Sequence, residues 1–149
     1  DLPGLFWLMM SWTSAINNSP RAEDMSDMAA LRVIAEWVME KDPGYEDAGA
    51  LVFLGGFESS MPKAYGGDPD KGRALFERAL ALTQRKNHIV LINYAKLYAV
   101  NQQDRKLYLS LLHEIIEAGD QGAPFRMSNK VARRRAVRAL ARVDEYFVE

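Results

Sequence analysis

The chain contains no cysteine among its 149 residues. A disulfide scaffold, a thiolate zinc site and a cysteine nucleophile are therefore excluded. Only two histidines are present, which is too few for a histidine-rich metal site. We accordingly expect no bound metal and no cofactor.

Neither sign of charge is in excess, because 19 Lys and Arg residues oppose 20 Asp and Glu residues. A dedicated nucleic-acid-binding protein normally carries a basic excess, so we expect no nucleic-acid partner. Hydrophobic residues make up 48% of the chain, enough for a substantial core. The length then indicates one domain, which we expect to span residues 1–149.

Long apolar runs are also lacking. The strongest, LFWLMM at residues 5–10, is much shorter than the roughly 20 apolar residues that a membrane-spanning helix needs. No basic segment precedes it, as one would in a signal peptide, so we predict a core helix over residues 3–16. Because the chain begins at Asp1 and enters this helix almost at once, we expect a truncated or processed chain whose N-terminus lies upstream.

Motifs for catalysis are absent too. The sequence contains neither G-x-x-x-x-G-K-[ST] nor G-x-S-x-G. His113, Glu114 and Glu117 are predicted on the solvent side of their helix, where they have no apolar surround to shift their pKa values. We therefore expect a protein that is not an enzyme.

Helical periodicity fills most of the chain, whereas period-two alternation and hairpin turns do not occur. The fold class that follows is all-α, an array of about seven antiparallel helices resembling a tetratricopeptide superhelix. The pair Gly55-Gly56 predicts either close approach by a neighbouring element or a kink, and we favour close approach. The helices are expected at residues 3–16, 26–41, from 45 to a loop at 59, from Asp68-Pro69 onward, 88–100, 103–118 and 126–147.

Arginines are concentrated in the last of these helices. Arg134, Arg138 and Arg142 recur every four residues and so form a stripe. Ion pairs with acids of the preceding helix, or interaction with the helix dipole, are the favoured interpretation. An anionic ligand or partner is the second, and nucleic acid is the third, because interleaved aromatic residues are missing.

Six residues are candidates for ligand or partner binding. Tyr94 and Tyr98 lie one helical turn apart, and Asn129 and Arg133 share a face four residues apart. Aromatic residues most often belong to the core, whereas a ligand pocket combines apolar walls with a few polar groups. The candidate set is Trp12, Tyr94, Tyr98, Asn129, Arg133 and Arg134.

A repeat-like helix gives the first resemblance. Gly72-x-x-x-Phe76-x-x-Ala79-Leu80 resembles the second helix of a tetratricopeptide repeat, in which small residues let a neighbouring helix approach. The loop at residues 61–68 is longer than the turn within a standard repeat, so a regular 34-residue array is not expected.

The order of several segments gives a more specific resemblance. LGGFESSMP at residues 54–62, GGDP at 66–69 and FERAL at 76–80 together resemble the T-component family of TRAP transporters. These are helical-repeat lipoproteins of tripartite ATP-independent periplasmic transport. Further segments fit in the same order: residues 5–8 with Trp12, 94–104 and 129–136.

The resemblance implies a periplasmic, non-enzymatic accessory protein. Such a protein would bind the solute-binding P-component of a TRAP system, form a homo-trimer and handle a hydrophobic or organic-acid ligand. The family's lipid-anchor cysteine would lie upstream, and this anchor would be the only attachment to the membrane. A generic tetratricopeptide-like interaction adaptor is the alternative function.

Overall fold

A computed structural model describes residues 1–18 and 24–148 of the protein. Within these residues the chain forms seven α-helices and no strand, which confirms the predicted all-α class. A π-helix, η2 (Tyr94–Ala99), continues α5, and three 3-10 turns are η1 (Lys63–Tyr65), η3 (Ala123–Phe125) and η4 (Val143–Glu145). The α-helices are α1 (Leu2–Asn18), α2 (Asp24–Lys41), α3 (Tyr45–Ser60), α4 (Pro69–Leu82), α5 (His88–Asn93), α6 (Arg105–Glu117) and α7 (Arg126–Leu140).

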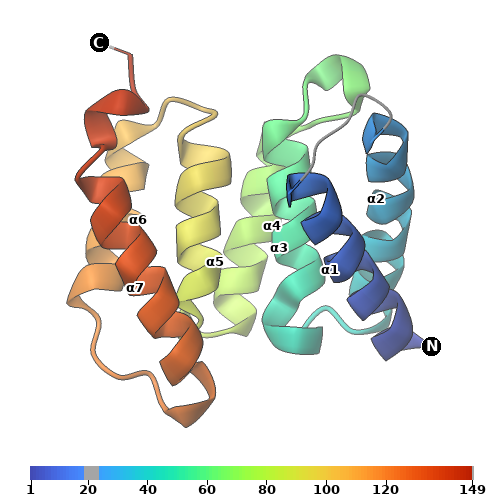
Figure 1. Ribbon diagram of the computed structural model, residues 1–149, viewed down its shortest axis with the longest axis horizontal. Helices are drawn as coiled ribbons and strands as arrows, with labels where there is room; N and C mark the ends of the chain where they lie inside the picture. Colours follow the sequence, from blue (N-terminus) through green and yellow to red (C-terminus); the bar gives the residue numbers. More distant parts are fainter. Residues whose placement is uncertain (19–23, 149) are drawn as a thin grey trace.

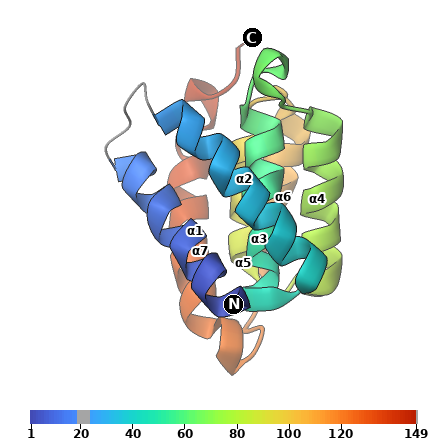
Figure 2. The same ribbon diagram turned by 90° about the vertical axis from the view of Figure 1, so that its right-hand side faces the viewer.

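Consecutive helices run antiparallel and lie side by side, with α1 to α4 in one half of the array and α5 to α7 in the other (Figure 1). The α5–η2 segment contacts helices of both halves, α3 and α4 as well as α6 and α7. Its predicted central position, inferred from an almost wholly apolar surface, is therefore confirmed. Helices α1 and α7 lie toward the same side of the array, and α4 lies on the other (Figure 2).

The second half of the central helix is wound more widely than expected. The Val100 N–H donates to the carbonyl of Ala95, five residues earlier, at 3.2 Å. The helix predicted over residues 88–100 is thus present, but its second half is a π-helix. Such segments are rare and occur often at functional sites.

The glycine pair of α3 lies where two neighbours come close. A β-carbon on Gly55 would lie 3.0 Å from the ring of Phe76, and one on Gly56 would lie 2.7 Å from Cδ1 of Leu97. Across the same contact, a β-carbon on Gly72 of α4 would lie only 3.1 Å from the Gly55 carbonyl oxygen. The close approach predicted from this pair is confirmed, and a larger residue at either position would displace the Phe76 ring of α4 or the Leu97 side chain of η2.

The expected end of α7 is wrong. The helix stops at Leu140 rather than Phe147, because the chain folds back over the start of α6. Gln103 holds this turn, donating to the carbonyl of Tyr146 and accepting from the N–H of Val148, each at 3.1 Å. Phe147 then packs edge-on against Tyr108, with ring centroids 5.1 Å apart.

Candidate functional site

A cavity of about 540 Å³ opens between α1, α3 and the α5–η2 segment. Its volume lies within the range typical of small-molecule sites. We call it the apolar cavity. Its apolar side chains are Phe6, Trp7, Met10, Met28, Val52, Phe53, Phe57, Met61, Ile89 and Leu97.

Two glycines of α3 bring the walls of the apolar cavity together. A β-carbon on Gly49 would lie 2.7 Å from the ring of Phe6, so only glycine lets α1 pack so closely. Gly56 does the same for Leu97 of η2 on the opposite side. Substitution of either glycine would therefore change the shape of the cavity.

Polar groups are few in this lining, and several are already engaged. The hydroxyl of Thr13 donates to the carbonyl of Met9 at 2.8 Å. The side-chain amide of Asn93 donates to the carbonyl of Ile89 at 2.9 Å. These bonds within a helix satisfy the donors, so the wall remains suited to apolar surface.

The charged residues of the described lining are both acidic. Glu46 and Asp47 lie at the start of α3, where three consecutive residues have left-handed φ angles of 47°, 55° and 66°. For residues other than glycine this conformation costs roughly 1 kcal/mol each. The strained turn places two exposed carboxylates at the edge of the apolar cavity.

Sequence comparison identifies the family. A model of the TRAP transporter T-component family matches residues 1–147 of the 149-residue chain. The chain belongs to the TRAP transporter T-component family. This is a transporter accessory family, and this T-component accordingly has an accessory role in TRAP transport. No curated protein matches the chain directly, and none of the helices described here is long and apolar enough to cross a membrane.

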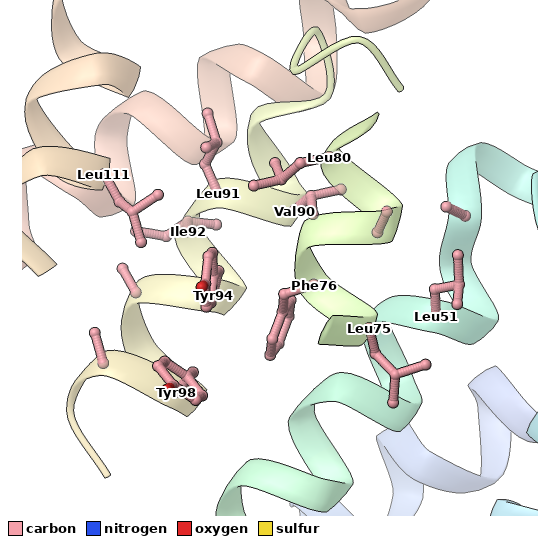
Figure 3. Packing of buried hydrophobic residues seen from close by; sticks show 14 of the residues in the cluster. Leu51, Leu75, Phe76, Leu80, Val90, Leu91, Ile92, Tyr94, Tyr98 and Leu111 are labelled. Carbon is pink, nitrogen blue, oxygen red and sulfur yellow. The ribbon is translucent and has the colours of Figure 1, made fainter. Parts of the chain in front are cut away.

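The tyrosines proposed for binding lie in the core of this T-component rather than in the apolar cavity. Tyr94 is fully buried and Tyr98 nearly so. The Tyr94 ring stacks on Phe76 of α4 (Figure 3). Its hydroxyl donates to Glu77 at 2.9 Å. Burial, together with this carboxylate, raises the pKa of the Tyr94 phenol. Their role in binding remains a prediction.

Trp12 joins the first two helices. It is half-buried, and its indole N–H donates to the carboxylate of Asp27 at 3.2 Å. The aromatic residues of α1 that line the apolar cavity are Phe6, which is buried, and Trp7, which is 54% exposed. Sequence reasoning missed Trp7, although its spacing of three from Met10 places both on one face of the helix.

Asn129 and Arg133 both line a second and smaller cavity, of about 250 Å³, beside α7. Asn129 accepts from the backbone N–H of His88 at 2.9 Å and donates to the carbonyl of Lys86 at 2.8 Å. Asn129 thus anchors α7 to the start of α5. Arg134 lies on the exposed face of α7 and is not part of this lining.

The ion pairs favoured for the arginine stripe do not form. Arg142 pairs with Glu145 of its own turn, and it lies beyond the end of α7. Arg134 and Arg138 have no carboxylate partner among the described side chains, those of residues 1–18 and 27–148. Glu114 of the preceding helix, one of the two acids predicted on its solvent side, accepts two hydrogen bonds from Arg85 of the α4–α5 turn instead.

His88 gives a pH-dependent prediction. Burial lowers its pKa, so the unfolded chain takes up this proton more readily than the folded one. Its contribution to stability is complete above the unfolded pKa, about 6.5, and declines as the pH falls below it. We expect the melting temperature to fall between pH 7 and pH 5 by calorimetry. His88→Gln should reduce this fall, whereas His113→Gln, at an exposed site, should not. An equal fall in melting temperature in the wild type and in His88→Gln would contradict the assignment.

Proposed function

We propose that this T-component binds a largely apolar ligand in the apolar cavity and serves the P-component of its TRAP system as a periplasmic partner. The observation that carries the proposal is a cavity of about 540 Å³ whose walls are mostly apolar. Attachment through an upstream lipid anchor and assembly as a homo-trimer are part of the same proposal. Sedimentation velocity measures the assembly.

The charges of the cavity favour one class of ligand. Its charged lining residues, within the described chain, are Glu46 and Asp47, and no lysine or arginine accompanies them. A ligand carboxylate would meet like charge without a compensating cation. Of the hydrophobic and organic-acid ligands that the family resemblance implied, we therefore favour a hydrophobic molecule with a neutral or cationic polar group.

A fluorescence titration tests the ligand. The neutral apolar probe N-phenyl-1-naphthylamine should bind with a rise and blue shift in emission, and dodecanol should displace it better than dodecanoate. Val52→Trp, which fills the cavity, should weaken binding about tenfold or more.

Val33→Trp is the matched control, because Val33 is 65% exposed on α2 and is outside the cavity lining. It should bind the probe like the wild type, and circular dichroism should show both variants folded. Failure of the wild type to bind, or equal binding by Val52→Trp, would contradict the proposed site.

A further inference from the structure

Helix α7 has a large excess of positive charge, which the near-neutral net charge of the whole chain does not reveal. Residues Arg126–Leu140 include six cations and no acid. The rest of the chain therefore has 13 cations against 20 acids. The near-neutral total is the sum of a basic helix and an acidic remainder.

Only one side of helix α7 is buried against the rest of the protein. Helix α7 packs on α5 and α6 through three small side chains, Ala132, Ala136 and Ala139. Its other side is exposed, and the helix lies in the half of the array opposite α1 to α4 (Figure 1). We define the α7 basic face by its exposed residues Lys130, Arg133, Arg134, Val137 and Arg138.

Internal ion pairs do not satisfy these cations. Exposed arginines outside this face do pair with carboxylates: Arg105 of α6 bonds Asp144 at 2.6 Å, and Arg126 at the start of α7 bonds Asp120 at 2.7 Å. Across the part of the chain that the structure describes, the four cations of the α7 basic face have no such partner. Their charge is therefore available to another molecule.

The same face has features of a protein interface. Its five residues line a surface hollow of about 510 Å³. Val137 is 50% exposed within it, and Met127 of the neighbouring turn is 73% exposed. Arginine and methionine are enriched in interfaces, and guanidinium groups bind carboxylates through paired hydrogen bonds.

We propose that the α7 basic face is the surface by which this protein binds an acidic surface of the P-component. The inference rests on the proposed function, which includes that partner. A two-fold contact between two α7 faces would oppose cation to cation, and such like-charge contacts are unfavourable. A contact of this face with a different face of a second copy, as in a trimer, is distinguished by the self-association outcome of the test. The hollow also fits a protruding acidic segment better than it fits a flat bilayer.

Charge removal tests the surface. The probe is the purified P-component of the same TRAP system, titrated by calorimetry. Lys130→Gln, Arg134→Gln and Arg138→Gln, combined in one variant, should weaken binding about tenfold or more. Binding of the wild type should also weaken from 50 to 300 mM salt, since the contacts are between charges, whose screening length is about 8–10 Å near 0.1 M. Glutamine keeps the helix propensity, and circular dichroism checks the fold.

A matched control removes the same charge from other elements. Arg78→Gln, Lys96→Gln and Lys106→Gln, combined, alter exposed residues of α4, η2 and α6. This variant should bind the P-component like the wild type. Equal losses in both variants would overturn the inference, because only net charge would then matter.

The remaining outcomes separate the two proposals. If the wild type binds the P-component and the α7 variant binds equally well, the surface is wrong and the partner stands. If the wild type does not bind, partner and surface fall together, while the apolar cavity is still tested by its own probe. If the α7 variant loses binding only to phosphatidylglycerol vesicles, the face binds lipid and the inference is overturned. If it loses only self-association, the face binds a second copy, which also overturns the inference.

Discussion

Replacement of Tyr94 by alanine is expected to destabilise the folded protein by about 3–5 kcal/mol, the usual cost of truncating a buried aromatic side chain. The Tyr94 ring is fully buried in the central helix. It stacks on Phe76 with centroids 5.0 Å apart and contacts the ring of Tyr98 at 5.3 Å. Alanine would leave a cavity at the contact between α4 and η2, which the tightly packed neighbours cannot fill.

Urea unfolding measures this cost, and Tyr94→Phe separates the ring from the hydroxyl. Phenylalanine keeps the stacking and loses only the bond to Glu77, whose exposed carboxylate can be hydrated instead. We expect it to cost about 0.5–1.5 kcal/mol. A stable Tyr94→Ala variant that nevertheless loses ligand binding would contradict the core role and support the binding role predicted from the sequence.

Replacement of Glu58 by alanine should have the second large effect, about 2–4 kcal/mol of lost stability. The Glu58 carboxylate is fully buried and holds three elements together. Arg32 of α2 and Lys71 of α4 each approach Oε1 at 2.9 Å, and the backbone N–H of Asp68 donates to Oε2 at 3.1 Å. Alanine would remove all of these contacts and release the loop that precedes α4.

Glu36 provides the control for Glu58. It also pairs with Arg32, at 3.1 Å, but its side chain is 38% exposed. Solvent-exposed pairs contribute about 0–1 kcal/mol, so Glu36→Ala should cost little by the same urea measurement. If the two variants proved equally stable, the Glu58 cluster would not hold the loop in place.

Much of the fold was predictable because it depends on local pattern. The repeat-like pattern of the fourth helix comprises Gly72, Phe76, Ala79 and Leu80, and all four are buried. Its start was predictable from Asp68-Pro69, and the Asp68 side chain indeed accepts from the N–H groups of Asp70 and Lys71. Such signals lie within a few residues of one another, so no knowledge of distant contacts is needed.

The site was less predictable. Tyr94 and Trp7 are both aromatic residues on apolar helices, yet one is fully buried and the other lines the apolar cavity. Helical periodicity tells which residues share a face but not which neighbour covers that face. The end of α7 was misjudged for the same reason, since Gln103, far away in sequence, holds the turn that ends it.

The sequence by itself determined the all-α class, most helix positions, the close approach at Gly55-Gly56 and the family. Each of these depends on the order and spacing of residues along the chain. Only the tertiary structure decided that α1, α3 and η2 line a cavity and that Glu58 joins three elements. It also decided that the four cations of the α7 basic face are exposed and have no carboxylate partner among the described residues. The residues that form these features are distant from one another in sequence. Their local patterns do not show that packing will bring them together.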